Sequence, residues 1–276
     1  MMRRKRFELM VSERDHSRVL VGEDIGNEHC TDLFLCLPGL LETRQSFSEL
    51  VEHLGPRVRV MTLDWCGRGD SEKLVDSHHY KMSTYLQDLG LFYAYAMGAL
   101  SNHDRGSRSR IHLVGSSMGG LLAVCFATRK PRLLGTVILN DVGPVLPWTG
   151  VLSLMTGLSS AKTTDVKQSG TLNTSRLAEE LNVDPQLIRA VQQPGHLDLP
   201  HETRLSGVDF STAFAAVTVP MLLLRGKNSE IINDSVVNRL FELHPLTRIH
   251  ECAQSGHPVA YNADVCHAIL DFTAKH

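Results

Sequence analysis

The chain has 276 residues, of which 42% are hydrophobic, and its formal net charge is −2. This composition is that of a globular protein with an apolar core, and it excludes a disordered chain. The near balance of 28 basic and 30 acidic residues gives no reason to expect a nucleic-acid-binding surface. One basic run, Arg3 to Arg6, is interpreted as a solvated N-terminal tail, with a nucleotide-binding arm as the alternative.

Neither a membrane span nor a signal peptide is expected. No segment has the ~18 apolar residues that a spanning helix requires, and no apolar run of ~7–15 residues follows the basic start. The cysteines form no CxxC pair and are scattered over positions 30, 36, 66, 125, 252 and 266. Scattered thiols, some inside apolar segments, favour a reduced cytoplasmic protein over a disulfide framework or a zinc site.

Short apolar runs alternate along the chain with stretches of helical periodicity. Residues 6–11 and 18–23 are predicted to form an antiparallel pair. Further strands are predicted, in chain order, at residues 33–37, 57–64, 110–116, 134–141, 219–226 and 247–252, and helices at residues 82–100, 118–130, 234–243 and 264–275. Continuous apolar runs indicate strands that are covered on both faces. The alternation therefore predicts an α/β protein with a doubly wound, mostly parallel sheet.

One stretch interrupts the alternation. Between residues 144 and 206 no convincing strand is visible, and the pattern indicates short helices separated by Pro and Gly. We interpret residues 145–207 as a small helical cap inserted into an α/β core of residues 1–144 and 208–276. Four apolar residues of this cap either line a substrate pocket or pack the cap onto the core: Leu152, Leu154, Met155 and Leu158.

A serine pair lies in the sequence Gly115-Ser116-Ser117-Met118-Gly119, after a predicted strand and before a predicted helix. A G-x-S-x-G sequence in this setting is typical of a nucleophile elbow, where a strained turn presents the serine hydroxyl. The positions two before and two after the nucleophile must be small, because the strand and the helix nearly touch there. Both positions are glycine only around Ser117, so Ser117 rather than Ser116 is the predicted nucleophile. A purely structural glycine turn is the alternative.

A serine hydroxyl needs a base within hydrogen-bond reach and a carboxylate that orients the base. Among the 14 histidines, His257 stands in "SGHP", after the last predicted strand and before the last predicted helix. This position places it at the same edge of the sheet as Ser117. His257 is therefore the predicted base, and a surface loop histidine is the alternative.

Taken together, these segments resemble the α/β-hydrolase superfamily over nearly the whole chain. "LPGLLETRQSF" resembles the oxyanion loop, "LDWCGRGDSEK" the segment after the fourth strand and "GSSMGG" the elbow. "LLLRGKNSEII" and "SGHP" resemble the acid loop and the histidine loop. The chain order Ser, acid, His is that of this fold. The resemblance implies an α/β-hydrolase fold and esterase-like serine hydrolase chemistry.

The resemblance also implies the triad acid and the oxyanion hole. Relatives usually have aspartate where Glu230 stands, and the register of the match favours Glu230 as the acid of a Ser-His-Glu triad. Asp141, at the end of the sixth strand, is the alternative acid. The backbone N–H groups of Leu40 and Met118 correspond to the oxyanion donors. Three polar residues are expected to stabilise their own loop rather than contact substrate: Asp64, Arg68 and Ser71.

The sequence thus predicts a carboxylesterase that forms an acyl-enzyme intermediate and acts on a small-molecule acyl substrate with an apolar portion. A carbon–carbon bond hydrolase or an acyltransferase with the same triad is an alternative, as is a catalytically inactive member that binds a small ligand. A dehalogenase or epoxide hydrolase is disfavoured, because those enzymes use a carboxylate nucleophile. No cofactor and no metal is expected, since no metal-ligand spacing is visible. The oligomeric state is not predicted.

Overall fold

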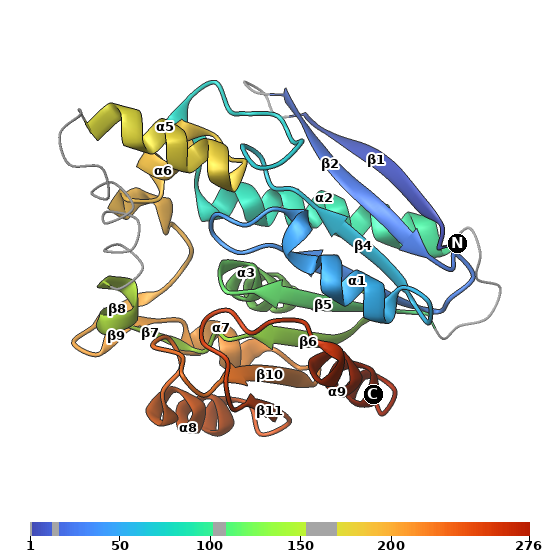
Figure 1. The fold of residues 1–276 in the computed structure, drawn as a ribbon. Helices are drawn as coiled ribbons and strands as arrows, with labels where there is room; N and C mark the ends of the chain where they lie inside the picture. The colour runs from blue at the N-terminus through green and yellow to red at the C-terminus, as the bar shows by residue number, and fades with distance from the viewer. Residues whose placement is uncertain (1, 13–16, 102–108, 153–169) are drawn as a thin grey trace.

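An eight-stranded sheet forms the centre of the molecule in the computed structural model, which describes residues 2–12, 17–101, 109–152 and 170–276 (Figure 1). The strands lie in the order β1-β2-β4-β3-β5-β6-β10-β11. β2 is antiparallel to both of its neighbours, and all other adjacent pairs are parallel. The predicted mostly parallel α/β class is confirmed. The strands of the sheet are β1 (Arg4–Ser12), β2 (Ser17–Gly26), β3 (Asp32–Leu37), β4 (Arg59–Leu63), β5 (Arg110–Ser116), β6 (Leu134–Asn140), β10 (Met221–Gly226) and β11 (Arg248–Cys252).

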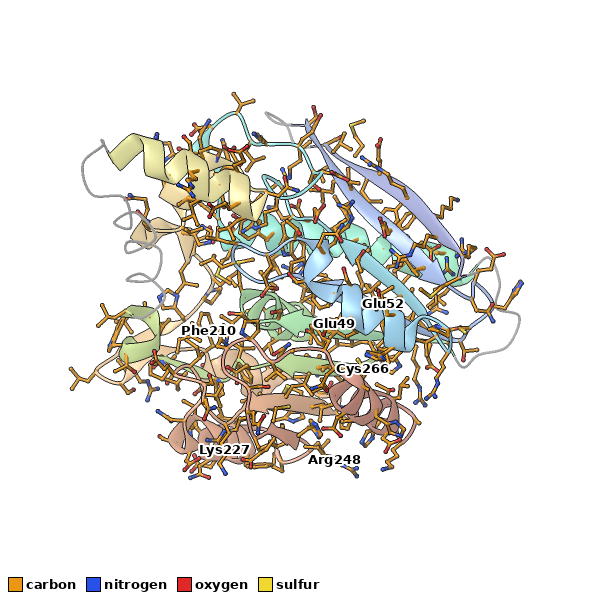
Figure 2. The ribbon with its side chains drawn as sticks, in the orientation of Figure 1. Glu49, Glu52, Phe210, Lys227, Arg248 and Cys266 are labelled. Atoms are coloured by element: carbon orange, nitrogen blue, oxygen red, sulfur yellow. The ribbon has the colours of Figure 1, made fainter. Side chains whose placement is uncertain are left out.

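Helices cover both faces of the sheet, because successive strand residues point to opposite faces. Leu35 of β3 belongs to the core cluster that includes α2 and α3, whereas its neighbours Phe34 and Cys36 pack with α1 and α9. Figure 2 shows Glu49 of α1 and Cys266 of α9 on this second face. The helices of the core are α1 (Ser48–Leu54), α2 (Met82–Ser101), α3 (Met118–Ala127), α7 (Ser211–Ala216), α8 (Asp234–Leu243) and α9 (Ala263–Thr273), with short 3₁₀ turns η1 (Arg44–Phe47) and η2 (Ser77–His79).

The N-terminal basic run is part of the sheet, which corrects the expected solvated tail. β1 begins at Arg4 and pairs with β2 over its whole length. Arg3 forms an ion pair with the buried Asp24 at 3.0 Å, and Arg4 and Arg6 form ion pairs with Glu23 and Asp70. The arginines therefore lie along an edge strand, where charged side chains also oppose unwanted strand pairing.

The segment between β6 and α7 contains strands as well as helices, so the expectation of an entirely helical insertion was wrong. The helices whose two ends are described are α5 (Gly170–Leu181), α6 (Pro185–Ala190) and the 3₁₀ turn η3 (Pro194–His196), and residues 148–152 are also helical. Three strands, β7 (Val145–Pro147), β8 (Glu202–Arg204) and β9 (Gly207–Asp209), pair in the antiparallel order β7-β9-β8. Each has three residues, which is too short to leave an alternating pattern in the sequence. We keep the name cap segment for residues 145–207; its boundaries as a domain stay a prediction.

The cap segment contacts the core through the loop that follows β4. The N–H of Gly69 donates to the carbonyl oxygen of Asn182 at 2.8 Å, and the N–H of Asp184 donates to that of Gly67 at 2.7 Å. The Tyr80 hydroxyl donates to the Asp184 carboxylate at 2.6 Å. In Figure 1 the described part of the cap segment lies past the ends of central strands such as β5 and β10. Within the described residues, no helix is both long and apolar enough to cross a membrane.

Candidate active site

Ser117 occupies a sharp turn between β5 and α3. Its backbone angles, φ 47° and ψ −114°, lie in a region that non-glycine residues rarely adopt. A Cβ atom at Gly115 would come within 2.4 Å of the Gly120 nitrogen, and one at Gly119 within 2.0 Å of the Leu37 carbonyl oxygen. Glycine is therefore required on both sides, as the sequence spacing around Ser117 predicts.

His257 lies beside this serine. Its Nε2 is 2.9 Å from the Ser117 hydroxyl oxygen. Asn140, at the end of β6, holds the histidine loop in place: its side chain donates to the carbonyl oxygen of Val259 and accepts from the Val259 N–H, both at 2.8 Å. The carbonyl of Asn140 also accepts from the N–H of Ser117 at 3.0 Å. Asn140 thus connects the serine and histidine loops. The sequence reasoning missed it, because the Val259 contact spans 119 residues.

The carboxylate that meets His257 belongs to Asp141 and not to Glu230. The Asp141 Oδ2 atom is 2.9 Å from His257 Nδ1, and the whole Asp141 side chain is buried. Glu230 is exposed, and no described hydrogen bond or ion pair involves it. The structure therefore corrects the expected Ser-His-Glu arrangement in favour of the alternative acid. Proton positions follow from chemistry: Asp141 only accepts, so Nδ1 carries hydrogen and Nε2 accepts from the Ser117 hydroxyl.

The loop after β10 explains why Glu230 points elsewhere. Its neighbour Ser229 donates a hydrogen bond to Asp141 Oδ2 at 2.5 Å, and the N–H of Gly226 donates to Oδ1 at 2.9 Å. The Ser229 oxygen in turn accepts from the N–H of Ile231 at 3.1 Å. This loop therefore supports the acid of β6 with a hydroxyl and an amide. The next helix, α8, is capped by Asn233, whose side chain accepts from the Val236 N–H.

The end of β3 and the start of the loop after it lie against the start of α3, because a Cβ atom at Gly119 would come within 2.0 Å of the Leu37 carbonyl oxygen and 2.8 Å of that of Pro38. No described group accepts a hydrogen bond from the N–H of Leu40 or from that of Met118, so both donors are available. Arg68 fixes the loop by donating from Nε and Nη2 to the Leu40 carbonyl oxygen, at 2.9 and 2.6 Å. Arg68 also donates to the Cys66 carbonyl oxygen at 3.0 Å, so it stabilises its own loop as expected and in addition ties that loop to the loop after β3.

Glu42 joins the same loop to the elbow. Its Oε2 accepts from the N–H of Gly39, and its Oε1 accepts from the hydroxyl of Ser116, both at 2.9 Å. Ser116, the other member of the serine pair, is therefore occupied by a contact away from His257. Asp64 and Ser71 also act within their loop as expected. Ser71 donates to the Asp64 carbonyl at 2.7 Å, and the Asp64 carboxylate accepts from the backbone N–H of Asp70 at 3.0 Å. The same carboxylate also accepts from the backbone N–H of Arg44, in the segment after β3.

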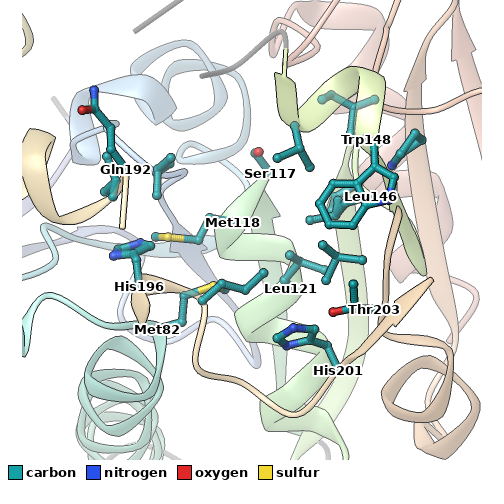
Figure 3. A pocket seen from close by; sticks show the side chains of 18 of the residues that line it. Met82, Ser117, Met118, Leu121, Leu146, Trp148, Gln192, His196, His201 and Thr203 are labelled. Carbon is teal, nitrogen blue, oxygen red and sulfur yellow. The ribbon is translucent and has the colours of Figure 1, made fainter. Parts of the chain in front are cut away.

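A cavity of about 470 Å³ opens beside Ser117 (Figure 3). Residues of the core and of the cap segment both line it. Most lining side chains are apolar, and none of those described is an arginine, lysine or carboxylate: Leu40, Met82, Ser117, Met118, Leu121, Val142, Leu146, Pro147, Trp148, Val151, Val191, Gln192, Gln193, His196, Leu197, His201, Thr203, Val208 and Ile231. The volume of the cavity and its mainly apolar lining are typical of a small-molecule site.

Of the four cap residues proposed from the sequence, only Leu152 is described by the structure. Leu152 is 62% exposed and lies outside the cavity. Leu154, Met155 and Leu158 lie outside the described residues. The apolar walls come instead from neighbours such as Leu146, which the sequence did not single out. Within the described residues, no group of three or more His, Cys, Asp or Glu side chains is arranged to hold a metal ion.

A family model described as "Serine aminopeptidase, S33" (Hydrolase_4) matches residues 29–260. The chain belongs to this family. The match spans both the serine elbow and the histidine loop, so it includes every residue of the site described above. Together with the sheet topology, it makes the chain a member of the α/β-hydrolase superfamily.

Two curated proteins and one solved structure illustrate what the chain is similar to. The chain is 31% identical over 114 residues to a 3-hydroxybutyrate-oligomer hydrolase of Cupriavidus necator, a match that covers 41% of this chain and 36% of that protein. It is 28% identical over 162 residues to 2-hydroxy-6-oxononadienedioate/2-hydroxy-6-oxononatrienedioate hydrolase 2 of Pseudomonas putida, covering 54% of this chain and 56% of that protein. The chain thus spans only about a third to a half of these relatives. A solved α/β hydrolase of Novosphingobium aromaticivorans shares the fold, with a TM-score of 0.73, 22% identity and coverage of 98% and 99% of the two chains.

Proposed function

We propose that this hydrolase cleaves carboxylic esters of apolar acyl groups through an acyl-enzyme intermediate. The observation that supports this most is the continuous hydrogen-bonded chain from Ser117 through His257 to Asp141, with Ser117 lining an apolar cavity. Nucleophile, base and acid in this geometry are the parts that acyl transfer to serine requires. In this proposal Asp141 replaces Glu230 as the triad acid.

The proposed reaction has two halves. Ser117 attacks the acyl carbon while His257 Nε2 takes its proton, and the N–H groups of Leu40 and Met118 stabilise the negative charge that develops on the carbonyl oxygen. The bond to the leaving alcohol breaks as His257 returns the proton to the alcohol oxygen. Water then attacks the acyl group with the same base, which releases the acid and restores the serine. Asp141 keeps the imidazole oriented and favours its protonated form in both halves.

The cavity favours an ester over the dicarboxylate that the name of the Pseudomonas putida relative specifies. A dianionic substrate would be bound most readily by arginine or lysine, and the described lining residues include neither. The apolar lining suits a neutral acyl chain, which gains free energy by leaving water. A carbon–carbon bond hydrolase with the same triad therefore stays the second candidate.

A series of p-nitrophenyl esters from acetate to decanoate tests the proposal, with the Ser117→Ala variant as control. We expect a burst of about one p-nitrophenolate per active site and a kcat/KM that rises with chain length until the cavity is filled. The competing substrate is 2-hydroxy-6-oxononadienedioate. Cleavage of that compound without turnover of any ester would contradict the ester proposal.

A further inference from the structure

A buried histidine faces the substrate cavity from the cap segment. His196 ends the 3₁₀ turn η3, is 6% exposed and lines the cavity that also contains Ser117. Its Nδ1 lies 2.8 Å from the backbone carbonyl oxygen of Tyr80. A carbonyl oxygen only accepts hydrogen bonds, so Nδ1 must carry the hydrogen of the ring. Nε2 is then left with its lone pair and is a hydrogen-bond acceptor.

This acceptor has no partner among the described residues. The Nε2 atom is buried and makes no hydrogen bond. Burial lowers the pKa of His196 to about 4, so the ring is neutral near neutral pH and Nε2 keeps its lone pair. Buried polar atoms nearly always have a hydrogen-bond partner, so an unpaired one in a substrate cavity points to a ligand group.

The surroundings show how a ligand would reach this atom. Figure 3 shows His196 at one side of the cavity, next to the side chains of Met82 and Met118. Methionine side chains adapt their shape easily, so a bound chain can displace them and contact the ring. The ring itself is held by the Tyr80 carbonyl and by the Tyr85 ring, whose centroid is 5.7 Å away. The direction of the Nε2 lone pair is therefore fixed, while the neighbouring methionine side chains can move to let a ligand reach it.

We propose that His196 selects esters whose apolar part carries a hydroxyl group, which donates its hydrogen to Nε2. The inference rests on the proposed ester hydrolysis at Ser117 and adds a second contact point further along the substrate. A hydroxyl fits better than an amide N–H, because an amide also brings a carbonyl that needs a donor in a mainly apolar cavity. An ammonium group fits poorly, because no described lining residue carries a carboxylate.

Ligand binding to the Ser117→Ala variant tests this without turnover. The probes are methyl hexanoates and octanoates with a hydroxyl at the third or the terminal carbon. Each is compared with one analogue that has methyl in place of the hydroxyl and one that has methoxy. Titration is followed by tryptophan fluorescence, since Trp148 lines the cavity. The measured quantity is the ratio of the methyl analogue's Kd to the hydroxyl ligand's Kd. We compare this ratio between the Ser117→Ala variant and two double variants that also carry His196→Phe or His196→Asn.

At one hydroxyl position we expect both His196 substitutions to lower this ratio by about tenfold, the size of one buried hydrogen bond. The ratio of the methyl analogue's Kd to the methoxy analogue's Kd should not change, because a methoxy group has no hydrogen to donate. His196→Asn can still donate to the Tyr80 carbonyl, so a loss seen in both variants comes from Nε2. His201→Phe is the matched control, because His201 also lines the cavity but is exposed and hydrogen-bonds the Leu199 carbonyl.

Two results would overturn the inference: a ratio that His196 does not affect at any hydroxyl position, or a shift that follows His201→Phe instead. Neither result depends on catalysis. Failure of the proposed function is seen separately, as absence of ester turnover by the unsubstituted protein. A hydroxyl preference in the binding assay would stand even then.

Discussion

The carboxylate of Asp141 is fully buried and accepts hydrogen bonds from Gly226, Ser229 and His257. A buried charge requires such partners, because transfer from water is costly without them. The backbone of Asp141 also has a positive φ of 55°, which aspartate tolerates better than most residues. These constraints make Asp141, and not the exposed Glu230, the residue whose loss removes orientation from the imidazole.

Replacing Asp141 by Asn tests this assignment. We expect kcat for p-nitrophenyl hexanoate to fall by about 10⁴, because an amide can hold His257 in the wrong tautomer and cannot stabilise its protonated form. Glu230→Gln is the control and should stay within about twofold of the parent. Circular dichroism checks that both variants are folded. The opposite order of effects would return the acid to the loop after β10.

For individual site residues, the sequence predicted those that belong to a recognisable local motif. Ser117 follows from the spacing of two glycines, and the histidine loop follows from its place after the last strand. The acid could not be chosen from the sequence, because Asp141 directly follows β6 and Glu230 lies in the loop after β10, and both strands end at the same edge of the sheet. The deciding contact, from Ser229 to Asp141, joins residues 88 apart. His196 was missed because nothing in its local sequence marks a buried ring.

Among the elements, the loop after β3 carries the Leu40 donor and needs a fixed position relative to α3. Glu42 provides this by accepting from Gly39 within the loop and from Ser116 on the elbow. An oxyanion donor acts only at hydrogen-bond distance from the developing charge, so a small shift of the loop weakens its contribution.

Glu42→Ala should therefore lower kcat about tenfold with a smaller effect on KM, since the donor is misplaced rather than removed. Glu42→Gln should keep most of the activity: its oxygen can accept from Gly39, and its amide can donate to the Ser116 hydroxyl. Steady-state kinetics on p-nitrophenyl hexanoate measures both. Equal losses in the two variants would indicate a role for the charge of Glu42 rather than for its hydrogen bonds.

Long apolar or periodic elements were predictable, whereas short ones were not. β10 was predicted from its run of leucines, and α2 from its helical spacing. α1 has seven residues and β7 three, so neither leaves a periodic pattern that can be recognised. The pairing of β7 with β9 is set by contacts between residues about 60 positions apart, which no local pattern encodes.

For the molecule as a whole, two buried histidines, His196 in the cap segment and His244 in the core, make the folding stability depend on pH. Burial lowers the pKa of His196 to about 4 and also lowers the pKa of His244. Both rings are therefore neutral in the folded protein under conditions where the unfolded chain, with a histidine pKa near ~6.5, takes up protons. Folding stability contributed in this way is present above pH ~6.5 and is lost as the pH falls toward ~4.

Urea unfolding at pH 7 and pH 5 measures this effect. We expect the free energy of unfolding to fall by about 2 kcal/mol from His196 alone between these two pH values. His196→Phe should be less stable at pH 7, because the Tyr80 carbonyl loses its donor, but its fall between pH 7 and pH 5 should be smaller. An identical fall in the parent and the variant would show that His196 is not buried in its neutral form.

The overall architecture follows from the alternation of apolar strands and helices, which the sequence displays openly. The joining of the cap segment to the core does not, because it depends on tertiary contacts such as that between Tyr80 and Asp184, 104 residues apart. The apolar character of the cavity was expected, but its lining could only be identified once the cap segment was placed.

Labelling with a fluorophosphonate probe, followed by mapping of the modified peptide, tests most directly whether Ser117 is a nucleophile activated by His257 and Asp141. We expect one modified serine, Ser117, with no labelling of Ser117→Ala and near-parental labelling of Ser116→Ala. Asp141→Asn should react far more slowly than Glu230→Gln. Modification of Ser116, or a label that persists in Ser117→Ala, would contradict the proposed triad.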